Sequence, residues 1–517
     1  MKKYSGVCKI ILSGILLEAS LFNQAQIWPR IYGDNISAYG KDLVESYDKG
    51  YNICGCIMKN ASQFKYGWII KTDINGNILW NKKYGDYQVE NLFWDFDRTE
   101  DGGIIIAGAT GQYDSQRDPL FVKLDPCGEI EWCKIFLSNQ DNYASAIIKL
   151  NSDGYLGMLT YYGGDAQNIR ISLVKMDATG EPIWIKHLAQ QDSVANEEGF
   201  FLYSTPDSNY LVSGVCFSPS IKPYFIKTDT SGEELWTIKW PAGTGGYASQ
   251  CAFPDNNYIY NASHLRFGDY PKVPYLLKFN ESGETIDQYP LMGDTIISGG
   301  ATSLLLYNDS ILFTGTTWTV DPWLFEGYSD ILKTDTLGNV QCMRRLINEH
   351  HPPTSIIKST DQKIIVLGYY YPDGNWDIYM WKMNQNLADD TLYTQPLTYD
   401  SLCPYEIQSD TLELDCGLFV NIDEIPTKEE YESSIKISPN PARDWVVLTL
   451  PDVVAAGKVE ITVYDVFGRE VEMGRQGELP VNRMLVLDVS GYPPGMYVVV
   501  VTDREGRRYS GKLVVNI

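Results

Sequence analysis

The sequence contains little histidine, little basic charge and no long apolar run. Its four histidines are spread over 517 residues and no Cys-x-x-Cys pair occurs, so a zinc site is not expected. Lysine and arginine number 42 against 66 acidic residues, a net charge of −24. Nucleic-acid binding requires a basic surface, so a nucleic-acid partner is excluded. The acidic excess is compatible with Ca²⁺ binding without requiring it, and we predict no cofactor and no metal site.

The only apolar stretch near the N-terminus is short. The stretch covers residues 10–17 and is preceded by Lys2, Lys3 and Lys9. Small residues follow it up to Ala25. This pattern predicts a secretory signal peptide over residues 1–25. Its removal takes away three lysines and one glutamate, leaving 39 basic and 65 acidic residues and a net charge of −26. No later segment reaches the 18 or so apolar residues of a spanning helix, so we expect an exported, soluble protein without a transmembrane segment.

Extended helical periodicity is also lacking. Glycine (44), tyrosine (36) and tryptophan (13) are abundant instead, which favours an all-β fold. The length exceeds that of most single cores, so we expect at least two domains.

Nine cysteines remain after residue 25, and an exported protein can form disulfides. Cys403 and Cys416 bracket a short segment and are the preferred pair. Cys127 with Cys133, and Cys216 with Cys251, are the alternatives, and the odd number leaves at least one free thiol.

A repeat of about 52 residues dominates residues 26–397. Its lysine recurs at Lys71, Lys123, Lys175, Lys227, Lys278, Lys333 and Lys382, in steps of 52, 52, 52, 51, 55 and 49. In the four best copies an Asp, a Gly and a Trp follow this lysine; these residues are Asp73, Gly76, Trp80, Asp125, Gly128, Trp132, Asp177, Gly180, Trp184, Asp229, Gly232 and Trp236. The period predicts seven copies of one supersecondary unit.

Each unit reads as four strands. A turn beginning with an acidic residue, as at Asp101 or Asp207, precedes a short apolar strand, and the Asp-x-x-Gly turn separates the third strand from a fourth that carries the Trp. Four-stranded units at this spacing predict a seven-bladed β-propeller over residues 26–397. In the second turn Asp binds its own backbone and Gly takes positive φ, while Trp packs on the next blade, so the motif is interpreted as structural.

The N-terminus matches the fourth strand of a unit. Residues 27–34 resemble residues 79–86, and Trp28 precedes Trp80 by the same 52 residues. The seventh unit lacks the Gly and Trp of its own fourth strand. We therefore expect the N-terminal strand to complete the last blade and close the ring.

The repeats resemble propellers of the delta-60 or quinoprotein-like kind and, more distantly, the Asp-box of sialidases. Asp177 and Gly180 are three positions apart, one fewer than in a quinoprotein hairpin and one more than in an Asp-box. In those families the motif is a blade hairpin remote from the chemistry, so the resemblance implies a fold and no activity.

Residues 434–517 have a different composition, with no Cys or His and balanced charge. Apolar residues alternate with a period of two at 459–463, 485–489 and 497–501, which predicts a small immunoglobulin-like β-sandwich. Five segments, at 437–441, 463–471, 487–491, 494–497 and 511–515, resemble the type A C-terminal sorting domain of type IX secretion cargo from Bacteroidetes-type bacteria. The motif residues are Pro439, Asn440, Pro441, Gly468, Gly495, Tyr497 and Lys512.

The resemblance implies a route and two partners. It implies export to the periplasm, recognition of this domain by the type IX translocon, and proteolytic removal by a sortase-like protease with anchoring or release at the cell surface. Residues 398–433 form a Cys-containing extension and an acidic linker, and cleavage is expected between residues 423 and 434.

No residue is assigned a catalytic role. Asp95, Asp97, Glu100 and Asp101 cluster near the start of a blade, where they could bind Ca²⁺ but fit a solvated turn better. Aromatic residues crowd the last two units and could stack on sugars or fill the blade cores; they are Trp318, Trp323, Tyr369, Tyr370, Tyr371, Trp376 and Trp381. We expect a monomeric binding or adhesion protein with an unidentified extracellular ligand. The alternative is a glycan- or peptide-degrading hydrolase or lyase with its site in the propeller funnel.

Overall fold

The computed structural model describes residues 28–420 and 435–515, apart from short gaps. The gaps are residues 34–35, 60–63, 86–88, 113–115, 138–140, 152–153, 164–167, 189–195, 218–219, 244, 255–256, 269–270, 292–297, 322–325, 350, 352, 373, 451–453, 455–456, 466–468, 481–482 and 505–507. In the residues between these gaps every regular element is a β-strand. The chain divides near residue 422 into two compact units. The predicted signal peptide and the predicted cleavage region lie outside the described residues.

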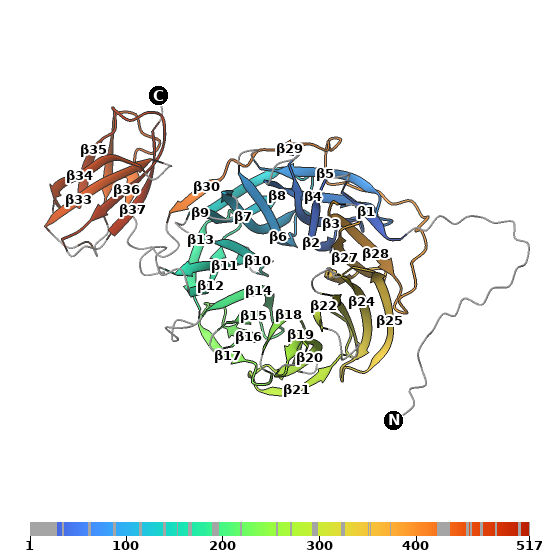
Figure 1. The fold of residues 1–517 in the computed structure, drawn as a ribbon. Helices are drawn as coiled ribbons and strands as arrows, with labels where there is room; N and C mark the ends of the chain where they lie inside the picture. The colour runs from blue at the N-terminus through green and yellow to red at the C-terminus, as the bar shows by residue number, and fades with distance from the viewer. Residues whose placement is uncertain are drawn as a thin grey trace, which may run out of the picture. The chain divides into compact units, whose positions relative to one another are not determined.

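The first unit consists of four-stranded sheets, two of them extended by a fifth strand. Figure 1 shows them side by side in a propeller-like ring, with strands such as β6, β10, β14 and β18 toward the centre. The strands of this unit are β1 (Arg30–Tyr32), β2 (Ala38–Glu45), β3 (Tyr51–Met58), β4 (Lys65–Thr72), β5 (Ile78–Tyr84), β6 (Glu90–Arg98), β7 (Ile104–Gln112), β8 (Gln116–Leu124), β9 (Ile130–Leu137), β10 (Tyr143–Lys149), β11 (Tyr155–Gly163), β12 (Asn168–Met176), β13 (Pro182–His187), β14 (Glu197–Ser204), β15 (Tyr210–Cys216), β16 (Lys222–Thr228), β17 (Glu234–Lys239), β18 (Gly245–Ala252), β19 (Tyr258–Arg266), β20 (Val273–Asn280), β21 (Thr285–Pro290), β22 (Ser298–Asn308), β23 (Ile311–Asp321), β24 (Glu326–Asp335), β25 (Val340–Ile347), β26 (Pro353–Lys358), β27 (Ile364–Tyr370), β28 (Asp377–Met383), β29 (Thr411–Leu412) and β30 (Gly417–Val420).

The two ends of the ring meet in one sheet. β1 pairs antiparallel with β28, with Arg30 opposite Met380 and Tyr32 opposite Ile378, so the sheet order is β1-β28-β27-β26. Trp28 is 1% exposed in the adjoining core. The hydroxyl of Tyr32 donates to the carbonyl of Gly76 (2.9 Å), which ties this strand to the sheet of β2–β5.

The Asp-x-x-Gly turns join the third and fourth strands of the sheets at the outer rim. In the turn at Asp177, one carboxylate oxygen accepts the backbone N–H groups of Thr179 and Glu181, and Gly180 has φ +78°. The turns at Asp73, Asp125 and Asp229 make the same two bonds. Each turn therefore satisfies its own backbone donors within a few residues.

Tryptophans of the fourth strands pack on the turn glycines of the next sheet. Nε1 of Trp132 donates to the carbonyl of Ala178 (3.1 Å), and a Cβ added to Gly180 would lie 2.6 Å from the Trp132 ring. A Cβ added to Gly128 would lie 2.9 Å from the Trp80 ring. The motif thus joins neighbouring sheets, and its residues are distributed over several outer turns without converging on one pocket.

Four of the repeat lysines form ion pairs with the acidic residues of the first turn, whose side chains range from 2% to 46% exposed. The four distances between Nζ and the carboxylate oxygen are 2.7 Å for Lys71–Asp48, Lys123–Asp101 and Lys227–Asp207, and 2.9 Å for Lys382–Asp361. These lysines are at most 3% exposed. In these four sheets the two recurring sequence elements are therefore the two partners of one ion pair.

Residues 389–420 form a strap along the outer edge of the ring, visible in orange in Figure 1. β29 adds to β5 in parallel and β30 adds to β9 in parallel. The Tyr393 carbonyl accepts from Asn75 and the Tyr399 hydroxyl accepts the N–H of Ile74. The strap therefore runs from the closing sheet, where Asp390 pairs with Lys363, across the sheet of β5 to the sheet of β9.

The predicted Cys403–Cys416 disulfide is wrong. Cys403 is bonded to Cys127 and Cys416 to Cys133, with Cα–Cα distances of 5.6 and 4.7 Å. The segment between Cys403 and Cys416 is extended along β5 and β9, which separates its ends and brings each to a different cysteine of the second sheet. The alternative pairs are also wrong. Cys127 and Cys133 are each bonded to a cysteine of the strap, and Cys251 is a buried thiol. Burial raises the pKa of this thiol to about 12.

The second unit has two sheets packed on one apolar core. One sheet has the order β31-β32-β35 and the other β34-β33-β36-β37. Their bounds are β31 (Lys436–Ser438), β32 (Trp445–Thr449), β33 (Lys458–Asp465), β34 (Glu470–Glu478), β35 (Met484–Asp488), β36 (Gly495–Thr502) and β37 (Arg508–Val515). Val446, Leu448, Val463, Leu487 and Val499 are fully buried between the sheets, and the exposed positions alternate with them as period-2 patterning requires.

Candidate functional site

A pocket of about 480 Å³ lies among the innermost strands of the ring. It is lined by aromatic and polar side chains from β2, β6, β10, β14, β22 and β26, namely Lys41, Trp94, Tyr143, Ser145, Glu198, Phe200, Phe201, Thr302 and Thr354, with Gly199 and Pro353. Because these strands belong to six sheets, the pocket exists only when the ring is closed.

β-bulges direct side chains into this pocket. Every innermost strand shows a register shift against its neighbour, for instance between Phe93 and Asp95 in β6 and between Gly199 and Phe201 in β14. In six of the seven strands the shift skips one residue; these residues are Lys41, Trp94, Ser145, Phe200, Thr302 and Thr354, and all six line the pocket. A bulge re-aims the side chain of the extra residue, so this repeated irregularity builds the pocket wall.

Trp94 and Tyr143 form the aromatic side of the pocket. Their ring centroids are 4.6 Å apart in an edge-to-face arrangement, and the Arg117 guanidinium lies 5.8 Å from the Trp94 ring. The Tyr143 hydroxyl donates to Oε1 of Glu198. Burial raises the pKa of Glu198, and the bond from Tyr143 opposes this shift. The Oγ of Ser145 is buried without a hydrogen-bond partner among the described residues.

A second aromatic group adjoins Lys41. The Nζ of Lys41 is 5.9 Å from the Tyr369 ring, which packs with Tyr39, His351 and Trp376 at centroid distances of 5.6–5.9 Å. Tyr371 contacts Trp376 and is 45% exposed. By contrast, Trp318 and Trp381 are buried in sheet cores, and Trp323 lies outside the described residues.

Two carboxyl groups of adjacent innermost strands share a hydrogen bond. Asp42 follows the bulge of β2 and Asp95 follows the bulge of β6, and their side chains are bonded to each other. Burial raises both pKa values, that of Asp42 to about 6 and that of Asp95 well above its usual range. The N–H of Leu43 donates to Asp42 (2.8 Å) and the N–H of Ile147 donates to Asp95 (2.7 Å). The pair thus holds a proton and joins the first three innermost strands.

The acidic cluster predicted near Asp95 is divided by the fold. Asp97 accepts the backbone N–H of Lys149 (2.9 Å), Glu100 pairs with Nζ of Lys149, and Asp101 pairs with Lys123. Among the described residues no three acidic, His or Cys side chains are placed to hold a metal ion. These carboxylates serve the turn and its neighbours.

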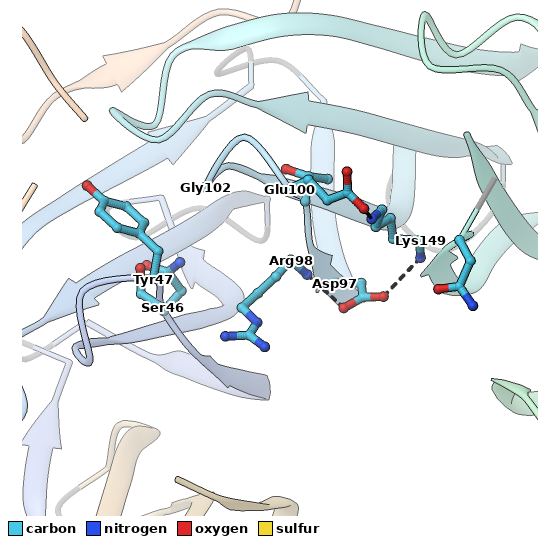
Figure 2. A pocket seen from close by; sticks show the side chains of 10 residues that line it. Ser46, Tyr47, Asp97, Arg98, Glu100, Gly102 and Lys149 are labelled. Carbon is cyan, nitrogen blue, oxygen red and sulfur yellow. Dashed lines mark hydrogen bonds and ion pairs between the residues drawn. The ribbon is translucent and has the colours of Figure 1, made fainter. Parts of the chain in front are cut away.

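A second pocket, of about 410 Å³, lies at and beyond the C-terminal ends of β2, β6 and β10. Figure 2 shows Asp97, Arg98, Glu100 and Lys149 around it, with Tyr47 across the space. It shares no lining residue with the central pocket.

The sorting-motif residues belong to the second unit. The Asn440 side chain donates to the carbonyl of Lys512 (2.7 Å) and accepts the N–H of Val514 (2.8 Å), so it holds the segment between β31 and β32 against β37. Pro439 and Pro441 flank it, Gly495 begins β36, and Tyr497 is buried with its hydroxyl bonded to Pro493. Gly468 lies outside the described residues.

The pocket residues carried a sequence signal that the repeat analysis missed. Lys41, Trp94, Phe200, Thr302 and Thr354 each stand seven positions before an Asp of a first turn (48 − 41, 101 − 94, 207 − 200, 309 − 302 and 361 − 354). Residue identity varies at this position, so a search for identical motifs passes over it.

Comparison with known proteins identifies the second unit. Residues 436–516 match the family of the secretion system C-terminal sorting domain. The chain carries a type IX sorting signal. It is therefore exported through the type IX system to the cell surface or the medium. No helix long and apolar enough to cross a bilayer occurs in the part of the chain that the structure describes.

The chain resembles solved structures only distantly, and no curated protein sequence matches it. A polysaccharide lyase of family PL25, an ulvan lyase, is 11% identical, with a TM-score of 0.45 over 69% of this chain and 96% of that one. A puromycin hydrolase is 9% identical, with a TM-score of 0.46 over 80% and 58% of the two chains. A protein of unknown function from Bacteroides caccae is 13% identical, with a TM-score of 0.31 over 48% and 81%. These likenesses transfer no ligand or activity.

Proposed function

We propose that the mature protein is a seven-bladed β-propeller, residues 26–397, joined by the segment 398–433 to an immunoglobulin-like sorting domain, residues 434–517. The sheet order and the β1–β28 pairing support seven blades, and the two packed sheets of the second unit support the sandwich. The signal peptide directs the first export step, and the translocon and a sortase-like protease act on the second unit of a monomeric, Bacteroidetes-type cargo protein.

We propose further that the propeller is a binding module that holds a glycan in its central pocket. The observation that carries this proposal is the set of bulge residues, which places the rings of Trp94 and Phe200 beside hydroxyl-bearing Ser145, Thr302 and Thr354. Aromatic faces stack on the apolar faces of sugars, and short hydroxyl side chains exchange hydrogen bonds with sugar hydroxyls. The pocket volume is within the range of small-molecule sites.

A hydrolase is the second candidate because of the Asp42–Asp95 pair. Carboxyls in direct hydrogen-bond contact are closer than the roughly 5–9.5 Å separation that glycosidases use. They are more similar to the two carboxyls of aspartic proteases, which share one proton and activate a water molecule for peptide hydrolysis. However, each carboxyl also accepts a backbone N–H, and Glu198 is held by Tyr143. Because these acids are engaged in holding strands together, the binding function is the better supported of the two.

The binding proposal is tested with the full-length protein on an immobilised glycan panel. Stacking on an aromatic ring contributes about 1–3 kcal/mol for a nucleic-acid base, and we expect about the lower value for a sugar, so Trp94→Ala should weaken binding about fivefold. Trp445→Ala removes a 53% exposed tryptophan of the second unit and serves as the matched control. Unchanged binding by Trp94→Ala, or no glycan retained by the wild type, would contradict the proposal.

The hydrolase candidate is tested separately. The wild type is incubated with the retained glycans and with a casein-derived peptide mixture, and products are followed by mass spectrometry. Turnover of a glycan or peptide by the wild type that is lost in Asp95→Asn would show that the protein is an enzyme. Binding without turnover would support the binding module.

A further inference from the structure

The second pocket has features of a binding site in its own right. Its residues come from three consecutive sheets: Ser46, Tyr47 and Asn52 from the first, residues 97–100 and Gly102 from the second, and Lys149 and Asn151 from the third. Nearly all of them are polar, and Tyr47 supplies the one aromatic ring. An apolar ligand is excluded by this lining.

The pocket offers hydrogen-bond donors on one side. Arg98 is exposed, and its Nη1 donates to the carbonyl of Glu45 (2.8 Å). The other guanidinium N–H groups have no partner among the described residues. In Figure 2 the guanidinium points away from Asp97 into the open space. A guanidinium fork of this kind suits a carboxylate.

Acceptors face the same space. Asn52 is 6% exposed, and its Oδ1 has no hydrogen-bond partner among the described residues. The Asp97 carboxylate accepts the backbone N–H groups of Arg98 (2.7 Å) and Lys149 (2.9 Å). Its oxygens keep further lone pairs that can accept from a ligand. A buried acceptor without a donor is costly, and a ligand N–H group would satisfy it.

We infer that this pocket binds a small zwitterion, a free amino acid or short peptide, whose carboxylate contacts Arg98 and whose ammonium group lies near Asn52 and Asp97. Glu100 and Lys149 pair with each other and balance in charge, so the pocket as a whole favours a ligand of no net charge. Burial raises the pKa of Asp97, and a ligand ammonium beside it would favour its ionised form.

The strap forms part of the pocket's surroundings. The Tyr47 hydroxyl accepts the N–H of Leu402 (3.4 Å), and Leu402 also lies against Gly102, where an added Cβ would be 2.6 Å from its Cδ1. The next residue, Cys403, is bonded to Cys127. Two lining residues of the pocket are therefore positioned by the disulfide-anchored strap, and ligand affinity should depend on this disulfide.

The test is calorimetric titration of the full-length protein with glycylglycine, N-acetylglycylglycine and glycylglycine amide. Each derivative removes one terminal charge, and a charge-assisted hydrogen bond contributes enough that each should bind at least about tenfold more weakly than glycylglycine. Arg98→Gln should weaken glycylglycine at least about tenfold, Arg98→Lys less, and Cys403→Ser measurably. Trp445→Ala, at an exposed tryptophan of the second unit, should leave the affinity unchanged.

Several results would overturn the inference. They are no saturable binding of glycylglycine, equal affinities for the three compounds, or equal affinities of the wild type and Arg98→Gln. Saturable binding of glucose in place of glycylglycine would assign the pocket to a neutral sugar and would equally contradict it. Arg98→Lys keeps the positive charge, so it provides a folded comparison if Arg98→Gln is unstable.

Discussion

The Nζ of Lys71 lies 2.7 Å from Oδ1 of Asp48, and both side chains are only 2% exposed. Burial lowers the pKa of Lys71 and the charge of Asp48 opposes this, so the ammonium depends on its partner. Removing one member of a buried ion pair leaves an uncompensated charge and costs about 3–5 kcal/mol. Lys71→Met is therefore expected to lower the free energy of unfolding by about this amount, measured by denaturant titration with tryptophan fluorescence.

Lys186→Met is the matched control for Lys71→Met. The Lys186–Glu233 pair also joins a lysine to a carboxylate, but its side chains are 32% and 65% exposed. Exposed pairs contribute about 0–1 kcal/mol. Equal losses in the two variants would show that burial does not determine the contribution of the repeat lysine.

Gly180 is expected to tolerate no side chain. Its φ is +78° and an added Cβ would lie 2.6 Å from the Trp132 ring, so Gly180→Ala combines backbone strain with overpacking. The two effects cost about 1–2 and 1–3 kcal/mol. Gly374 has φ +91° with no atom within 4 Å of an added Cβ, so Gly374→Ala reports the strain alone. If thermal unfolding shifts both variants equally, the contact between the sheets is not what constrains Gly180.

The all-β character and the four-stranded units could be predicted because both depend on local, repeated patterns. The steps between the repeat lysines count the units, and turn residues such as Asp177 and Gly180 mark where strands end. The match between Trp28 and Trp80 pointed to the long-range pairing of β1 with β28, since the repeat supplies the strand that the last unit lacks.

The disulfides and the pocket could not be predicted in the same way. Cys127 and Cys403 are 276 residues apart, and nothing local shows that the strap adds parallel strands to β5 and β9. The pocket depends on bulges, which alter the direction of single side chains such as Trp94 without altering the strand pattern. The pocket residues vary between repeats, whereas the turn residues recur with little change because every sheet needs the same turn.

The Asp42–Asp95 pair should make stability decrease as pH rises. Both carboxyls have a raised pKa in the folded state, so the folded protein binds protons more tightly than the unfolded chain. The contribution of the pair is fully present below about pH 4, the unfolded pKa, and is lost as pH rises through about 6 for Asp42. The pKa of Asp42 rises by about two units, which corresponds to about 3 kcal/mol, so we expect a loss of about this size between pH 4 and pH 8.

Asp95→Asn should remove most of this dependence. Its amide donates to Asp42 in place of the shared proton, so the variant should be more stable than the wild type at pH 8 and should show a flatter profile from pH 4 to pH 8. Asp287→Asn changes an exposed carboxylate and serves as the control. Parallel profiles for the wild type and Asp95→Asn would show that the two carboxyls do not share a proton.

The strap should be joined to the ring through Cys127–Cys403 and Cys133–Cys416. Non-reducing proteolysis and mass spectrometry of the secreted protein should yield peptides that link these positions, and a peptide with Cys403 bonded to Cys416 would contradict the structure.

The bonds close loops of 276 and 283 residues, which span the ring from the second sheet to the strap. Loss of a native disulfide commonly costs about 2–5 kcal/mol. Cys416→Ser should therefore lower the unfolding temperature and make residues 404–420 more sensitive to protease, while Cys251→Ser, at a buried thiol outside the strap, should leave strap cleavage unchanged because it frees no strand from the ring.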